Sequence, residues 1–393
     1  MDNVKNRVEK DGLVSELSGH IDSSNAEAVE AAINEARVKS REGNFTLDAQ
    51  NLEYISSAGL RVILRLSQVE PTLKMINVSS AVFEVLEMTG FSEMIPIEKA
   101  YRVLSIEGCE VIGQGANGKV YRIDADTIIN VYNNPDSLPD IKRERELARK
   151  AFVKGIPTAI PYDVVKVGNG YGSVFELLSA KSFSKLLMED PSKIDDIVKM
   201  FVDLLKKIHS TNVEPGEMPD KRAVYLDYAH FLADYLPKDQ ADKLTALIEA
   251  VPDVHKMIHG DYHTKNVMLQ KGEVLLIDMD TLSYGHPIFE FASMYLGFVG
   301  FGEADPSQAG QFLGIPYDLA KTFFHKCMAQ YLSTSDEEKI NEVVDKSRIL
   351  GYARMLRRSI RRYGLDSVEG KPSISLCQKE LAELLPRYQT LTF

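Results

Sequence analysis

The sequence lacks several features that mark common protein classes. Its 393 residues include no tryptophan and only three cysteines, which lie far apart and form no Cys-x-x-Cys pair. A zinc site or a disulfide framework is therefore not expected, whereas a reducing compartment such as the bacterial cytoplasm is. No apolar run approaches the roughly 18 residues that predict a membrane span. The charged N-terminus also lacks the apolar segment of a signal peptide.

Positive charge is also scarce in this chain. Lys and Arg together number 46 against 57 Asp and Glu, which gives a net charge of −11. Sequence-independent nucleic-acid binding depends on the neutralisation of phosphates by Lys and Arg, so we do not expect it here. The hydrophobic share of 44% is ordinary for a globular protein, and the length allows two or three domains.

The most informative stretch is IHGDYHTKNVMLQKGEVLLIDMD, which occupies residues 258–280. Asp261 precedes Asn266 by five residues, and an apolar run after a Lys-Gly turn ends in Asp278. Phosphoryl transfer from a magnesium nucleotide needs one carboxylate at the acceptor hydroxyl and hard oxygen ligands for Mg²⁺. The spacing therefore predicts Asp261 as the catalytic carboxylate and Asn266 and Asp278 as metal ligands. A surface turn rich in Asp, Asn and His is the simpler alternative.

The order His-Gly-Asp-x-His-x-x-Asn resembles the catalytic loop of the aminoglycoside phosphotransferases and choline kinases, which are related to the protein kinases. The resemblance implies an α+β bilobal fold with a small β-rich lobe and a large helical lobe. It also implies ATP or GTP as phosphate donor, Mg²⁺ as cofactor and a hydroxyl of a small molecule as acceptor.

Four further residues are expected to support this loop. His259 and His263 are expected to hold the loop through hydrogen bonds. Strand alternation from Asp278 would place Asp280 on the same side as that residue. Glu290 matches a position where the family usually has an Asp that braces the loop.

A second nucleotide motif lies upstream, in VIGQGANGKVYRIDADTIINVY. Gly113, Gly115, Gly118 and Val120 form a G-x-G-x-x-G-x-V pattern between two strand-like runs. Glycines allow a hairpin to place backbone N–H groups on phosphates. A Rossmann fingerprint would need a helix directly after the glycines, and a P-loop would need Ser or Thr where Val120 stands. The kinase-type glycine-rich loop fits both flanks.

One position departs from the pattern of the resembled family. The second strand of that fold carries a lysine that pairs with the α- and β-phosphates and with a helix glutamate. The matching residue is Asn130, which carries no charge. The glutamate is available as Glu144, or less favourably Glu146. Lys119 is a substitute for the lysine only if it faces the nucleotide, and strand alternation points it away. The departure favours an alternative, a catalytically weak or inactive pseudokinase that senses nucleotide.

The run YGSVFELL, ending at Leu178, predicts the last strand of the small lobe and the hinge. A hinge offers adenine its backbone N–H and C=O, here between Glu176 and Leu178. Beyond it the chain is helical, and a basic run forms either a solvated helix face or a surface for an anionic substrate or partner. Its members are Arg354, Arg357, Arg358, Arg361 and Arg362.

The first hundred residues alternate strand-like and helix-like segments, which predicts a small α/β domain. The pattern L-x-G-x-I-D, followed by D-x-x-N-L-x-Y-I-S-S-A-G-L-R-V, resembles the STAS domain of anti-sigma-factor antagonists. In that family a serine ahead of the Gly-Leu pair is phosphorylated by a partner kinase, and this controls binding. The matching residue is Ser57, although Ser56 stands where Asp is common. Ser57 could equally be a plain helix N-cap.

The sequence thus predicts a STAS-like domain over residues 1–100, a kinase-like small lobe over 101–182, a helical lobe over 183–365 and a C-terminal tail over 366–393. The first interpretation is a phosphotransferase coupled to a STAS regulatory or interaction domain, with an anti-sigma-factor-like protein partner. The second is a pseudokinase in a partner-switching system. A third adds that the kinase domain phosphorylates Ser57 of its own or a sister chain.

Overall fold

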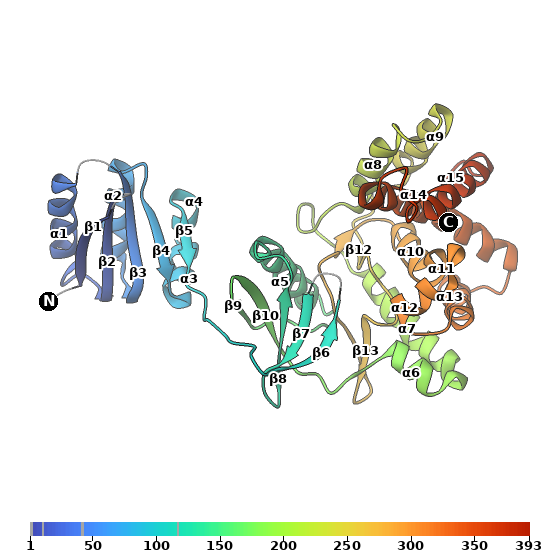
Figure 1. Cartoon of the computed structure of the whole chain (residues 1–393), viewed down its shortest axis with the longest axis horizontal. Helices are drawn as coiled ribbons and strands as arrows, with labels where there is room; N and C mark the ends of the chain where they lie inside the picture. The colour runs from blue at the N-terminus through green and yellow to red at the C-terminus, as the bar shows by residue number, and fades with distance from the viewer. Residues whose placement is uncertain (1–2, 10–11, 41–42, 116–117) are drawn as a thin grey trace. The chain divides into compact units, whose positions relative to one another are not determined.

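A computed structural model describes residues 3–9, 12–40, 43–115 and 118–393 of the chain, with the elements labelled in Figure 1. The chain divides into two compact units. One comprises residues 1–107 and 164–172, and the other comprises 108–163 and 173–393. No helix in the described ranges is both long enough and apolar enough to cross a membrane.

The N-terminal strands form one five-stranded sheet in the order β1-β2-β3-β4-β5. β1 is antiparallel to β2, and the remaining neighbours are parallel, so a helix is needed in each crossover. The strands are β1 (Val4–Glu9), β2 (Gly12–Ile21), β3 (Asn44–Ile55), β4 (Lys74–Val78) and β5 (Ile97–Lys99). The helices are α1 (Ala26–Lys39), α2 (Ser57–Val69), α3 (Ser80–Met88) and α4 (Phe91–Met94).

Helix α2 begins at the two serines that the sequence singled out. Ser56 is the N-cap, and its side chain accepts a hydrogen bond of 3.1 Å from the Ala58 N–H. Ser57 is the first helical residue and is exposed, so its interpretation as the N-cap was wrong. Gly59 is buried, and a Cβ there would lie 2.7 Å from Ile55 and 2.9 Å from Ile21. The start of α2 therefore packs closely against the sheet and leaves the Ser57 side chain in solvent.

A second five-stranded sheet has the order β6-β7-β8-β10-β9. β6 and β7 form an antiparallel hairpin around the glycine motif, and β8 continues the sheet antiparallel to β7. Residues 116–117, between β6 and β7 in the sequence, lie outside the described ranges. The strands are β6 (Glu110–Gln114), β7 (Gly118–Arg122), β8 (Thr127–Tyr132), β9 (Asp163–Val167) and β10 (Gly170–Glu176), and α5 (Leu138–Val153) lies between β8 and β9 in the sequence.

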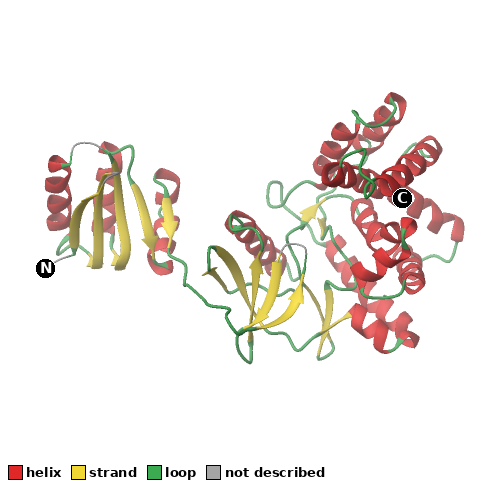
Figure 2. Cartoon of the chain, in the orientation of Figure 1, coloured by secondary structure: helices red, strands yellow, loops and turns green. Residues whose placement is uncertain are grey.

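Helices dominate the chain after β10 (Figure 2). They are α6 (Phe183–Glu189), α7 (Ile194–Ser210), α8 (Lys221–Leu232), α9 (Lys238–Glu249), α10 (Ile288–Tyr295), α11 (Phe301–Ala304), α12 (Pro306–Leu313), α13 (Tyr317–Leu332), α14 (Glu337–Tyr363) and α15 (Lys371–Leu384). Short strands lie among them: β11 (Lys181–Ser182), β12 (Met257–Ile258), β13 (Val267–Gln270), β14 (Glu273–Leu276) and β15 (Ser283–Tyr284). A π-helix, residues 296–300, joins α10 to α11.

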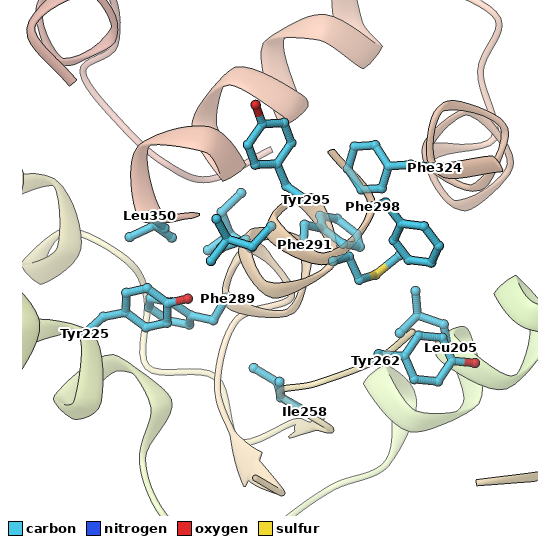
Figure 3. Close-up of a cluster of buried hydrophobic side chains, with 14 of the residues drawn as sticks. Leu205, Tyr225, Ile258, Tyr262, Phe289, Phe291, Tyr295, Phe298, Phe324 and Leu350 are labelled. Carbon is cyan, nitrogen blue, oxygen red and sulfur yellow. The ribbon is translucent and has the colours of Figure 1, made fainter. Parts of the chain in front are cut away.

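The helical lobe is held by one large apolar core (Figure 3). α7 contributes the stripe that its sequence periodicity predicts, including Phe201 and Leu205, which are completely buried. Tyr262, next to Asp261, is also in this core, and its hydroxyl donates a hydrogen bond of 2.8 Å to the Phe201 carbonyl. The core thus fixes the residue beside the predicted catalytic carboxylate.

The segment 366–393, set apart in the sequence as a tail, packs into this same core. α15 buries Ile374, Cys377, Leu381 and Leu384. The predicted fold class is confirmed: an α/β N-terminal domain is followed by an α+β part with a small β-rich lobe and a large helical lobe.

Candidate functional site

The two predicted metal ligands meet at the open end of a hairpin. β13 and β14 pair with Val267 opposite Leu276, and the Ile277 N–H donates a hydrogen bond of 2.9 Å to the Asn266 carbonyl. Asn266, just before β13, is therefore brought beside Asp278, just after β14. Asp278 has a φ of 65°, in the left-handed region that non-glycine residues rarely occupy. Such backbone strain is typical of functional positions.

A buried carboxylate holds the loop that carries Asp261. Glu290 is completely buried on α10 and accepts hydrogen bonds from the N–H groups of His259, at 2.6 Å, and Gly260, at 2.9 Å. Burial alone would raise the pKa of Glu290, but the His209 Nε2, 3.7 Å from the Glu290 Oε2, and nearby positive charge bring it below its ordinary value. Glu290 is therefore ionised at neutral pH and fixes the backbone directly before Asp261.

Asp261 is the carboxylate that the sequence predicts to be catalytic, and its side chain is about one third exposed. Its Oδ2 lies 3.4 Å from the His263 Nε2, and its N–H donates to the His259 Nδ1 at 3.3 Å. Burial would raise the pKa of Asp261, but the contact with His263 and the charge of Arg354 lower it to about 2. Such a carboxylate is a weak base, so it is better suited to orienting a hydroxyl than to removing its proton early.

Asn266 is oriented by the same loop. Its Nδ2 donates a hydrogen bond of 3.1 Å to the Asp261 carbonyl, which leaves its side-chain oxygen for another partner. Asp278 has a raised pKa because it is buried and because Asp280, Glu144 and Asp261 surround it with negative charge. Crowded carboxylates of this kind fit a divalent cation.

The described residues contain no group of three or more His, Cys, Asp or Glu side chains arranged to hold a metal by themselves. Asp280 interacts with Asp278, but not through strand alternation, because β14 ends at Leu276.

Close approach of β7 to β8 explains one glycine of the motif. The Gly115 N–H donates to the Gly118 carbonyl at 2.9 Å, beyond the last strand pair of the hairpin. A Cβ on Gly118 would lie 2.4 Å from the Val131 carbonyl oxygen and 3.0 Å from the Asn130 Oδ1. Gly113 faces Val120 across the hairpin. Glycine is thus required at position 118 because β8 passes so close.

The residue of β8 that contacts Glu144 on α5 is Tyr132. The Tyr132 hydroxyl donates a hydrogen bond of 2.6 Å to the Glu144 Oε2. Burial, and then the charge of Asp280, raise the pKa of Glu144. Glu146, the alternative glutamate, is exposed on α5 and lies within 3.6 Å of Lys150. Sequence reasoning missed Tyr132, although it stands two residues after Asn130 and therefore shares its face of β8.

The predicted hinge follows β10. Glu176 is the last residue of that strand and is exposed, and Leu178 is half-buried. Between them, the Leu177 N–H donates a hydrogen bond of 2.7 Å to the Asp126 carbonyl. That backbone donor is therefore already engaged with the β7–β8 turn.

Two family models match this chain. The model described as the phosphotransferase enzyme family matches residues 108–319, which is more than half of the chain. The chain belongs to this phosphotransferase family. The STAS domain model matches residues 3–103, so the phosphotransferase part follows a STAS domain. Both resemblances drawn from the sequence motifs are confirmed.

Individual proteins resemble each part of this phosphotransferase-family chain. The candidate anti-sigma factor antagonist BtrV of Bordetella bronchiseptica is 40% identical over 89 residues, which are 22% of this chain and 76% of that protein. Among solved structures, the gentamicin complex of APH(2'')-IIa is 13% identical with a TM-score of 0.47, covering 76% of this chain and 95% of the other. ADP-bound aminoglycoside phosphotransferase APH(2'')-Ib is 13% identical with a TM-score of 0.47, covering 77% and 96%.

Proposed function

We propose that this chain transfers the γ-phosphate of ATP or GTP to a hydroxyl group of a small molecule. The observation that carries the proposal is the convergence of Asp261, Asn266 and Asp278 within the segment that matches the phosphotransferase family. In the reaction the acceptor oxygen bonds to the γ-phosphorus while the bond to the β–γ bridging oxygen breaks, which leaves a nucleoside diphosphate. The hydroxyl proton passes through Asp261 to solvent.

The residues of the loop contribute mainly by positioning. Asp261 is ionised and held by His263 and the Glu290-anchored backbone, so it can fix the acceptor oxygen in line with the phosphorus. Asn266 and Asp278 would hold Mg²⁺, which neutralises charge on the phosphates when bound. The hairpin of β6 and β7, which carries Gly113 and Gly118, would lie over the phosphates.

Thermal unfolding with Mg-ATP, Mg-GTP, or nucleotide with EDTA tests this proposal. A ligand present at a hundred times its Kd adds about 2.7 kcal/mol to the stability of the native state. We expect a metal-dependent rise in Tm with at least one nucleotide, followed by nucleoside diphosphate release when a suitable alcohol is added. The absence of any metal-dependent rise with either nucleotide would overturn the proposal.

A nucleotide-sensing pseudokinase is the second candidate, and the Tyr132–Glu144 pair favours it. Where the resembled fold has a lysine, this chain has Asn130. The helix glutamate, Glu144, accepts its hydrogen bond from the neutral Tyr132 hydroxyl instead. The phosphates thus lose one cation of the usual set. A Mg-nucleotide stabilisation without diphosphate release, across a panel of alcohols, would identify this candidate.

The STAS domain supplies the second half of the proposal. We propose that it binds an anti-sigma-factor-like protein and that phosphorylation of Ser57 controls this binding. The supporting observation is the exposed position of Ser57 at the start of α2, where the positive end of the helix dipole favours a phosphate.

A further inference from the structure

A buried lysine lies beside the catalytic loop without a partner. Lys221 is the first residue of α8, and only 9% of its surface is exposed. Within the described residues, its ammonium group makes no hydrogen bond and no ion pair within 4 Å, although the charges of Glu290, Asp261 and Asp280 act on it from farther away. A buried charge is costly unless it is closely paired, so the free hydrogen-bonding capacity of this ammonium suits an anionic ligand.

The ammonium lies directly against the residue before Asp261. A Cβ built on Gly260 would be 2.5 Å from the Lys221 Nζ, and the φ of Gly260 is 85°. Glycine is therefore required at position 260, both for its backbone conformation and to make room for the ammonium. The ammonium therefore lies close to the backbone that carries Asp261.

Positive charge gathers on this side of Asp261. Arg354 on α14 donates hydrogen bonds to the Ser293 Oγ, at 2.8 Å, and to the Gly260 carbonyl, at 3.4 Å. Arg358, one turn along α14, interacts electrostatically with Asp261 as well. Arg357 is neutralised by Asp227 at 3.2 Å. In the part of the chain that the structure describes, no ion pair neutralises Arg354, Arg358, Arg361 or Arg362.

Carboxylates also surround Asp261. Asp278, Asp280 and Glu144 interact with one another where the metal and nucleotide are proposed to bind. Asp261 interacts both with Asp278 and with the cations Arg354 and Arg358. A polycationic acceptor would bring like charges against Lys221 and Arg354. An acceptor with an acid group would form an ion pair with the Lys221 ammonium.

We infer that Lys221, backed by Arg354, binds a carboxylate or phosphate group of the acceptor, so that the substrate is an anionic hydroxy compound. This inference rests on the proposed phosphotransferase function. The γ-phosphate of the nucleotide is a second source of anionic oxygen, so the test first fills that position with a non-hydrolysable nucleotide.

The test is calorimetric titration of the full chain saturated with Mg-AMP-PNP. The probes are glycerol 3-phosphate, glycerate, neutral glycerol and the amino sugar kanamycin. We expect the two acids to bind and the other two not to bind at the same concentrations. Lys221→Met should weaken acid binding at least about tenfold, whereas Lys221→Arg should retain most of it. Lys238→Met removes an exposed lysine that pairs with Asp242, and it should bind like the wild type.

Two results would overturn the inference: equal acid binding by the wild type and Lys221→Met, or no acid binding by the wild type. The Tm of Lys221→Met serves as the control for folding. Removal of a buried charge that has no close partner should raise Tm, whereas loss of a structural contact would lower it. The proposed function fails separately, if Mg-AMP-PNP does not raise the wild-type Tm. In that case the acid titrations of the nucleotide-free chain still decide whether Lys221 forms an anion site.

Discussion

The Tyr132 hydroxyl donates a hydrogen bond of 2.6 Å to the Glu144 Oε2, across the face between β8 and α5. In protein kinases, a lysine on a strand of the small lobe contacts the corresponding helix glutamate. Here the strand supplies a neutral donor, and Glu144 remains a partly buried carboxylate whose pKa is raised by desolvation and by Asp280. The small lobe therefore adds negative charge near Asp280, and under the proposed function this would increase the dependence of nucleotide binding on Mg²⁺.

Tyr132→Phe should destabilise the protein by about 1–3 kcal/mol, because it leaves the buried Glu144 carboxylate without its donor. Urea unfolding measures the change, at constant m-value. Tyr162→Phe is the matched control, since Tyr162 is exposed and makes only a long contact of 3.4 Å with Thr127. Equal stability of the two variants would show that the Tyr132 hydrogen bond contributes nothing net.

Asp278→Asn should stabilise the metal-free protein at neutral pH and abolish the Mg²⁺-dependent part of nucleotide binding. The folded-state pKa of Asp278 is raised, so its contribution to stability is complete below its ordinary value of 3.8 and is lost as the pH rises through the folded-state value. Asparagine removes the charge and tolerates the left-handed backbone at this position.

The measurement is Tm in EDTA between pH 4 and pH 8 for both proteins, repeated with Mg-nucleotide. The wild-type Tm should fall more steeply with rising pH than that of Asp278→Asn. Asp366→Asn, at an exposed position after α14, serves as the control for loss of one negative charge. Parallel pH curves, or an unchanged Mg-nucleotide shift in Asp278→Asn, would contradict the metal assignment.

Local motifs account for the part of this molecule that the sequence predicted. Asp261, Asn266 and Asp278 lie within one loop and one hairpin, so their spacing along the chain nearly determines their meeting in space. The glycine hairpin around Gly115 is predictable for the same reason.

Tertiary packing accounts for what the sequence did not reveal. Lys221 reaches the loop from α8, which lies well upstream of Gly260, and no spacing rule connects the two residues. The pairing of Tyr132 with Glu144 depends on which face of β8 meets α5. The sequence did not determine which serine caps α2, because this depends on the exact first residue of the helix. Ser56 and Ser57 are adjacent, and sequence patterns do not locate a helix start to a single residue.

The two serines of α2 should respond differently to substitution. Ser56→Ala removes the N-cap bond to the Ala58 N–H and should cost about 1 kcal/mol, whereas Ser57→Ala should change the unfolding free energy little. Intact mass after incubation with Mg-ATP then tests self-phosphorylation. If the kinase domain phosphorylates Ser57, as the third interpretation holds, the wild type gains one phosphate and Ser57→Ala and Asp261→Asn gain none. Unmodified wild type, or a phosphate that persists in Ser57→Ala, would reject this role for the kinase domain.

Lys221 should make the protein more stable as the solution becomes alkaline. Burial, and then the charge of Arg354, lower the pKa of Lys221 from 10.5 to about 8. Between these values the unfolded chain binds more protons than the native state, so the stability penalty of the buried ammonium is complete below about pH 8 and disappears as the pH rises toward 10.5. At 1.36 kcal/mol per pKa unit, the gain is about 3 kcal/mol.

The stability difference between Lys221→Met and the wild type isolates this gain, because the two proteins share their other titrating groups. The difference should be largest at pH 7, where methionine is the more stable residue, and it should shrink as the pH rises above 8. Lys238→Met should show no such trend, since Lys238 is exposed beside Asp242. A difference that stays constant from pH 7 to pH 10 would mean that Lys221 titrates as an ordinary solvated lysine, and the case for an anion bound beside Asp261 would lose its physical basis.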